Sequence, residues 1–158
     1  ALPDDWEILY ESTIVQMLRP DPAPLPEGDA DVVRLTATDV DEMLALVDLT
    51  QPGPFRTRTI ELGTYIGIRD GGRLIAMAGE RSCTGAFHEV SAGCTHPDAQ
   101  GRGLARGLIG RVVNRMLRAG ETPYLHVDCR NPRAIDLYRA LGFVRRAEFP
   151  LLHAQRAR

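Results

Sequence analysis

The segment 89–108, EVSAGCTHPDAQGRGLARGL, combines residue types that can bind a phosphate group. Its first half has the composition of a strand, and a turn with two glycines then opens a long helix. In such a turn several backbone N–H groups and the positive end of the helix dipole point toward one place, where a phosphate can sit. Gly101 and Gly103 carry no side chain, so the backbone can come close to the ligand. We therefore expect an anion-binding turn at the start of this helix.

Two arginines near the start of the same helix support this interpretation. The first turns contain Arg102 and Arg106 and no acidic residue, whereas helix starts usually favour Asp or Glu. Positive side chains at the positive end of a helix repel it unless an anion lies between them. A bound di- or polyphosphate would provide that anion, and the alternative is that both arginines point into solvent.

The pattern is not that of the common nucleotide-binding loops. The chain has no lysine, so GRGLARG cannot be the GxxxxGK[ST] loop. A dinucleotide fingerprint needs GxGxxG, and its third glycine position is Arg106. Glu121 lies about 20 residues farther on, as the acidic residue of that motif would, but it precedes the next expected strand instead of ending it.

The elements around this segment predict a mixed sheet covered by helices. Apolar residues between 103 and 118 form one continuous helical stripe, which Gly120 ends. The other expected elements are strands at 32–35, 65–68, 74–77, 89–95 and 124–129, helices at 38–50 and 132–140, and a strand or hairpin at 143–153. Hairpins combined with crossover connections imply an α+β fold, with a mixed, mostly antiparallel sheet flanked by helices.

The first 30 residues read as a separate part of the chain. Residues 1–18 are an amphipathic stretch of uncertain type, and four prolines between 20 and 26 indicate a stiff linker. We therefore expect an N-terminal extension and linker at 1–30, one domain at 31–153 and a short tail at 154–158.

Composition excludes several classes of protein. The 158 residues carry a net charge of −2, with 12 acids and two arginines in the first 50 residues and a basic remainder. This balance suits a small anionic ligand better than a nucleic acid. No apolar run could span a membrane. The three cysteines and four histidines show no ligand spacing, so we expect no metal, and the odd cysteine number fits the cytoplasm.

Two motifs in the chain resemble those of the GNAT superfamily of N-acetyltransferases. The residues Gln100-Gly101-Arg102-Gly103-Leu104-Ala105 fit the [Q/R]-x-x-G-x-[G/A] signature of that superfamily. A second motif runs from Asn131 and Ala134 through Tyr138 to Phe143, about 30 residues later and after an intervening strand. The resemblance covers residues 31–153 and implies a GNAT fold, in which the strands at 89–95 and 124–129 splay apart.

The resemblance also implies acetyl-CoA as co-substrate. Its pyrophosphate would lie on the N–H groups of the turn, and its pantetheine arm would pair with the strand edge at Cys94 and Thr95. Asn131 would contact the arm where it leaves the splay. The implied cofactor-binding set is Cys94, Thr95, Gln100, Gly101, Arg102, Gly103, Leu104, Ala105, Arg106, Asn131 and Ala134.

Transfer of an acetyl group to an amine requires a base for the amine and an acid for the leaving thiolate. The resemblance points to Tyr138 as the acid, and the alternative is a tyrosine that only caps the core. For the base we favour Glu89, 11 residues before Gln100, with Glu80 or neither carboxylate as alternatives. Strict alternation would place Glu89, Ser91 and Gly93 on one face of the strand and Val90, Ala92 and Cys94 on the other.

The function expected from the sequence is direct acetyl transfer from acetyl-CoA to an amine in a ternary complex. The acceptor would be a small molecule or a peptide, with no nucleic acid or membrane partner, and a homodimer is one assembly we consider. Two alternatives stay open: a non-catalytic acyl-CoA-binding or sensing domain, and a Rossmann-type dinucleotide-binding domain.

Overall fold

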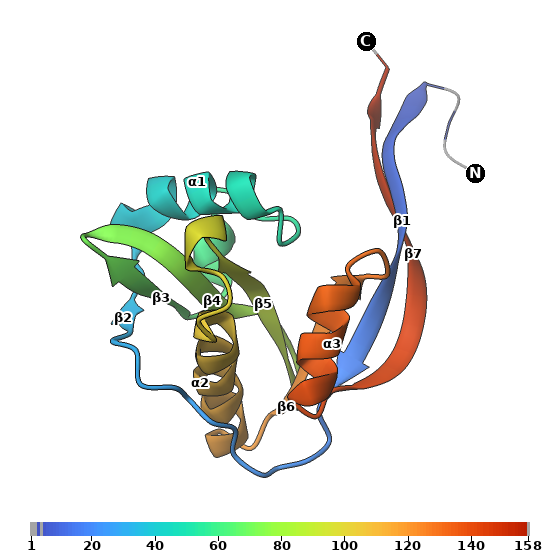
Figure 1. The fold of residues 1–158 in the computed structure, drawn as a ribbon. Helices are drawn as coiled ribbons and strands as arrows, with labels where there is room; N and C mark the ends of the chain where they lie inside the picture. Colours follow the sequence, from blue (N-terminus) through green and yellow to red (C-terminus); the bar gives the residue numbers. More distant parts are fainter. Residues whose placement is uncertain (1–2, 4, 158) are drawn as a thin grey trace.

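The computed structural model describes residue 3 and residues 5–157, whose strands form one twisted sheet (Figure 1). Seven strands are arranged in the order β2-β3-β4-β5-β6-β1-β7. Their bounds are β1 Trp6–Leu18, β2 Val33–Arg34, β3 Tyr65–Asp70, β4 Arg73–Thr84, β5 Phe87–Thr95, β6 Thr122–Asp128 and β7 Val144–Arg156. Only β5 and β6 pair in parallel, and the other neighbours are antiparallel. This confirms the predicted mixed, mostly antiparallel sheet and contradicts a Rossmann-type parallel sheet.

Helices cover both faces of the sheet. Helix α1 (Val40–Thr50) closes one core with β4 and β5, around Met43, Tyr65 and Met77. Helices α2 (Leu104–Arg118) and α3 (Pro132–Ala140) close the larger core on the other face. The apolar stripe of α2 forms the centre of this second core, with Leu108, Ile109, Val112, Val113 and Met116 all buried.

The pairing between β5 and β6 is short. It joins Phe87, His88 and Glu89 of β5 to Thr122, Pro123 and Tyr124 of β6, and it does not continue toward Thr95. The carboxyl-terminal halves of the two strands therefore diverge, as the predicted splay requires. Within the described residues, the edge of β5 that faces β6 has no strand partner after Glu89.

The N-terminal stretch forms part of the same sheet. Strand β1 lies between β6 and β7 and pairs with β7 along most of its length, from Trp6 with Arg156 to Leu18 with Val144. Figure 1 shows the two strands leaving the body of the molecule side by side. Residues 6–18 thus pair within the sheet, although the sequence indicated an extension outside the domain.

The proline-rich segment after β1 is docked on α2. Asn114 of α2 accepts a hydrogen bond from the Leu25 N–H at 2.7 Å and donates one to the Leu25 carbonyl at 2.8 Å. Arg111 donates to the carbonyls of Glu27 and Gly28 at 3.2 and 3.1 Å. The segment therefore packs against the domain instead of forming a free linker.

Among the described residues, none of the helices has both the length and the apolar character needed to cross a membrane.

Candidate active site

The turn before α2 presents a row of free backbone donors. Gly101 and Gly103 have φ values of +78° and +74°, in the left-handed region that other residues rarely adopt. The first backbone bond of the helix runs from the Gly107 N–H to the Gly103 carbonyl at 3.1 Å. Within the described residues, no backbone carbonyl accepts from the N–H groups of 101–106. These donors lie at the positive end of a 15-residue helix, an arrangement suited to an anion.

The side chains around this turn leave it open. Arg102 is exposed and lies 3.5 Å from Asp70, and Arg106 is also exposed. The side-chain carbonyl of Gln100 accepts a hydrogen bond from Arg133 at 2.8 Å. Leu104 and Ala105, next in the helix, are half-buried. Residues 100–106, which were predicted to bind the diphosphate, thus lie together, with two arginines beside the free N–H groups.

A bulge distorts β5 just before it reaches this turn. Gly79 of β4 pairs with Ser91, and Met77 pairs with Cys94, so Ala92 and Gly93 lie opposite a single residue. Ala92 has a φ of +53°, a strained value for a residue with a side chain. Such a bulge bends the strand and turns its N–H groups away from the regular ladder.

The bulge overturns the predicted alternation of side chains along β5. Val90 belongs to the core under α2, whereas Ala92 and Cys94 pack with the core under α1. Because one residue is inserted, positions on either side of it change faces. The expectation that Val90, Ala92 and Cys94 share a face was therefore wrong.

Cys94 and Thr95 end β5 at the splay. Burial raises the pKa of the Cys94 thiol to about 11, so the thiol stays protonated at neutral pH and is a poor nucleophile. The Thr95 hydroxyl is buried and has no hydrogen-bond partner among the described residues. A buried hydroxyl without a partner is costly, and a ligand along this edge could satisfy it.

Tyr138 reaches from α3 toward the bulge. A Cβ built on Gly93 would lie 3.7 Å from the Tyr138 hydroxyl oxygen, in van der Waals contact, so the hydroxyl lies directly against the bulge. The tyrosine ring packs edge-on against Phe143, with 6.0 Å between ring centroids. Burial, and secondarily the nearby Cys94, raises the pKa of Tyr138 to about 12. The hydroxyl is therefore held as a proton donor beside the distorted strand.

Asn131 caps the helix that carries this tyrosine. Its side-chain oxygen accepts a hydrogen bond from the Ala134 N–H at 3.0 Å, and Pro132 follows as the first helical residue. The side-chain oxygen of Asn131 is therefore used by the cap, which leaves its amide group as the donor for a ligand. Ala134 is half-buried at the same end of the helix and packs against the core under α2.

Glu89 lies on the opposite face of the sheet from Tyr138. Its neighbours His88 and Val90 both face α2, so Glu89 points to the α1 side. Its carboxylate accepts two hydrogen bonds from Arg81, at 2.7 and 3.1 Å, and contacts His126 Nδ1 at 2.9 Å. Burial raises the pKa of Glu89, but the bonds from His126 and Arg81 outweigh it and lower the pKa to about 2.

The alternative carboxylate, Glu80, lies elsewhere. It is on the α2 face, ion-paired with Arg115 and bonded to the Thr64 N–H at 3.2 Å. It lines a hollow of about 260 Å³ between β3, β4, α2 and Glu27. The Tyr138 side chain does not line this hollow.

Comparison with known proteins places this site in a family. The family model described as FR47-like protein matches residues 65–149, which contain β3 to β6, α2, α3 and the start of β7. The chain belongs to the FR47-like family, within the GNAT superfamily of N-acetyltransferases. The match includes both sequence motifs and confirms the resemblance on which they were interpreted.

Relatives and solved structures agree with this assignment. The chain is 37% identical over 84 residues to the N-alpha-acetyltransferase RimI of Mycobacterium tuberculosis, covering 51% of this chain and 52% of that protein. An uncharacterized protein of Mycobacterium leprae is 31% identical over 159 residues, covering 92% of this chain and 44% of the relative. The chain thus spans about half the length of these curated relatives.

A solved structure is similar over the whole chain. It is a putative acetyltransferase of the GNAT family from Novosphingobium aromaticivorans, 39% identical, with a TM-score of 0.91. The match covers 100% of this chain and 70% of that one.

Sequence reasoning missed the partners of Glu89. Arg81 comes from β4 and His126 from β6, and His126 Nε2 lies 3.1 Å from the side-chain nitrogen of Gln16 in β1. No spacing in the sequence links these residues, because each reaches the group from a different strand.

Proposed function

We propose that this protein transfers an acetyl group from acetyl-CoA to the amine of a small molecule or peptide, by direct attack in a ternary complex. The observation that carries the proposal is the meeting of three features at one place. The first turn of α2 has free backbone N–H groups. The edge of β5 that faces β6 has no strand partner after Glu89 among the described residues, and Tyr138 points at the bulge in that strand.

The residues present suit coenzyme A as the donor of the acetyl group. The N–H groups of 101–106 would hold its diphosphate, with Arg102 and Arg106 beside them. The edge at Cys94 and Thr95 would pair with the pantetheine arm, and the amide group of Asn131 would bind it at the start of α3. Acetyl-CoA, when bound, supplies the activated acetyl group as a thioester.

Tyr138 would act as the general acid. Its hydroxyl lies beside the bulge, where an N–H close to Cys94 would polarise the thioester carbonyl. The raised pKa keeps the hydroxyl protonated through the neutral range, so it can give its proton to the sulfur as the thiolate leaves.

Glu89 would provide the base on the other face of the sheet, together with His126. Both oxygens of the carboxylate are already bonded, and its lowered pKa makes it a weak proton acceptor by itself. As an anion it orients His126, whose Nδ1 donates to it. His126 Nε2 then accepts a hydrogen bond from the side-chain amide of Gln16, and the acceptor amine would have to displace Gln16 to give its proton to this nitrogen.

The composition of the first 50 residues would favour a positively charged amine as the acceptor. The first 50 residues hold 12 acids and two arginines, and the loop at 50–62 lies near the end of α1. RimI of M. tuberculosis is named an N-alpha-acetyltransferase, and MnaT of Escherichia coli an L-amino acid N-acyltransferase. Both names fit acceptors with a free amino group. As a separate part of the proposal, we place the reaction in the cytoplasm.

A thiol-release assay tests the proposal. The protein is mixed with acetyl-CoA and a panel of amines that includes peptides with free N-termini, amino acids and polyamines. In parallel, thermal unfolding is followed with acetyl-CoA, CoA or NAD, where ligand at 100 times its dissociation constant adds about 2.7 kcal/mol of stability. We expect stabilisation by both CoA species and release of CoA with at least one amine. Stabilisation without turnover would indicate an acyl-CoA-binding domain, and stabilisation by NAD alone would contradict the proposal.

A further inference from the structure

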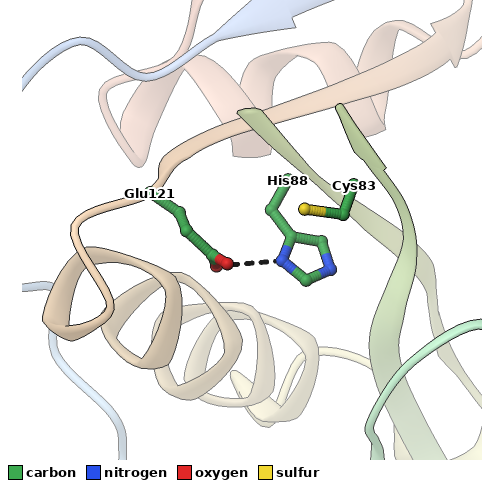
Figure 2. Close-up of side chains that lie close together, drawn as sticks. All are labelled: Cys83, His88 and Glu121. Atoms are coloured by element: carbon green, nitrogen blue, oxygen red, sulfur yellow. Dashed lines mark hydrogen bonds and ion pairs between the residues drawn. The ribbon is translucent and has the colours of Figure 1, made fainter. Parts of the chain in front are cut away.

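Three metal-ligating side chains meet at the closed end of the β5–β6 pair, away from the splay (Figure 2). Cys83 comes from the end of β4, His88 from the start of β5, and Glu121 from the turn between α2 and β6. One ligand atom from each lies within 4.8 Å of the others. His88 lies six positions before Cys94 along β5, and its side chain is on the face of the sheet opposite that of its neighbour Glu89, so the cluster does not share side chains with the proposed active site.

His88 is the buried member of the cluster, and its two ring nitrogens face two carboxylates. Its side chain is 10% exposed. Nδ1 lies 2.9 Å from the Glu121 carboxylate, and Nε2 lies 4.0 Å from the Glu80 carboxylate. Nε2 has no hydrogen-bond partner within the described part of the chain. A neutral imidazole has a single N–H, so one of the nitrogens must turn a lone pair toward a carboxylate.

A cation bound at Nδ1 removes this conflict. The ring proton then sits on Nε2 and points toward Glu80, which is itself held by Arg115 and the Thr64 N–H. A histidine that binds a metal through one nitrogen commonly directs its other N–H to a carboxylate in this way. The orphaned nitrogen and the position of Glu80 both agree with a bound cation.

The thiol of Cys83 selects the class of cation. Cys83 is exposed and unpaired, and apart from a weak contact to the Gly85 carbonyl at 3.8 Å it faces the cluster. Thiolate, imidazole and carboxylate together are a ligand set for zinc and similar transition metals, not for magnesium or calcium. We propose that Cys83, His88 and Glu121 bind one Zn²⁺ ion, with water as the fourth ligand.

Binding would require small movements and release one proton. Tetrahedral zinc separates such ligand atoms by about 3.3 to 3.6 Å, so the exposed Cys83 and the half-buried Glu121 must close in on His88. The Cys83 thiol loses its proton to solvent as the Zn–S bond forms. The proton on His88 Nδ1 leaves for solvent while Nε2 takes one up, so the ring stays neutral.

The metal ion would link the β4–β5 hairpin to the turn between α2 and β6. The β4–β5 hairpin and the turn after α2 already touch here, where the Thr122 N–H donates to the Ala86 carbonyl at 2.7 Å. A zinc ion at this point would hold β5 and β6 together at their paired end, opposite the end that diverges. The site would therefore be structural, which explains why its ligands lie far from Tyr138.

Cobalt substitution tests the site directly. Reduced, chelator-treated protein is titrated with Co²⁺, and absorption is followed for the thiolate-to-cobalt charge-transfer band and the visible bands of tetrahedral Co²⁺. Zinc affinity is measured by competition with a coloured chelator. The variant Cys83→Ser is compared with Cys129→Ser, because Cys129 is the other exposed cysteine and lies outside the cluster.

We expect one Co²⁺ per chain with both sets of bands in the wild type and in Cys129→Ser. Cys83→Ser should lose the charge-transfer band and bind Zn²⁺ at least tenfold more weakly, with an unchanged circular dichroism spectrum. Absence of the band in the wild type would overturn the proposal and leave the cluster as a hydrogen bond between His88 and Glu121 beside a free Cys83. An equal band in Cys83→Ser would also overturn it.

Discussion

Tyr138 and Glu89 have opposite environments, and these environments suit opposite roles. The tyrosine hydroxyl lies against Gly93 in apolar surroundings, which raise its pKa and keep its proton in place. The glutamate is surrounded by Arg81 and His126, which keep it charged in spite of its burial. The sequence identified both residues through motif positions, but it could not show that Glu89 is already fully bonded.

Replacing Tyr138 by phenylalanine removes the proposed acid and keeps the ring against Phe143. We expect kcat to fall about 10²- to 10⁴-fold, the range for a general acid, while the dissociation constant of acetyl-CoA stays within threefold. Because the pKa of Tyr138 is raised to about 12, its ionisation should cause no loss of wild-type rate below pH 10. Steady-state rates across pH, together with equilibrium binding, measure both effects. An unchanged kcat would show that the tyrosine only caps the core.

Replacing Glu89 by glutamine tests the base on the other face. Without the anion, His126 loses the charged partner that orients its ring, so kcat should fall at least 10²-fold. Glu80→Gln is a matched control, since Glu80 is an equally buried, arginine-paired carboxylate on the face away from the proposed acceptor. We expect Glu80→Gln to keep kcat within threefold. Turnover of Glu89→Gln within threefold of the wild type would mean that another group takes the proton.

At the scale of elements, the start of α2 was predictable and the distortion of β5 was not. Two glycines, two arginines and an apolar stripe with helical spacing are local signals, and all lie within about 20 residues. The bulge depends on how β5 registers with β4, and the sequence VSAGCT reads equally well as a regular strand. The predicted alternation failed at this point for that reason, and with it the expected faces of Ala92 and Cys94.

The variant Gly103→Ala tests the phosphate-binding turn at 101–106. An alanine at a φ of +74° costs about 1–2 kcal/mol of stability and moves the N–H groups that follow it. Gly72→Ala is the control, because Gly72 has a similar φ of +84°, lies in the β3–β4 turn and likewise has open space around it. We expect both variants to lose similar stability in urea unfolding. Only Gly103→Ala should weaken acetyl-CoA binding, by about tenfold or more.

At the scale of the whole molecule, the contacts that the sequence did not predict join residues far apart in the chain. Strand β1 is assigned by its pairing with β6 and β7, more than 100 residues away, and nothing in residues 1–18 alone indicates those partners. The segment at 25–28 reads as a linker because of its prolines, yet its carbonyls are bonded by Arg111 and Asn114. Both arrangements depend on surfaces that exist only once the domain has folded.

The variant Gly110→Ala tests the docked segment. In a free helix this change would stabilise by about 1 kcal/mol. Here the added Cβ would lie 2.2 Å from the Pro26 carbonyl oxygen, so the segment must move off α2. We expect a net loss of about 1–3 kcal/mol in the free energy of unfolding, measured by urea denaturation. A gain in stability would show that residues 25–28 are not held against the helix in solution.

The most direct test of the account is a crystal structure of the protein with CoA bound. We expect diphosphate oxygens at about 2.8–3.0 Å from backbone nitrogens of residues 101–106, and the pantetheine arm along the edge of β5 that faces β6, with its sulfur beside Tyr138. A coenzyme bound elsewhere on the surface, or no bound coenzyme at saturating concentration, would contradict the account.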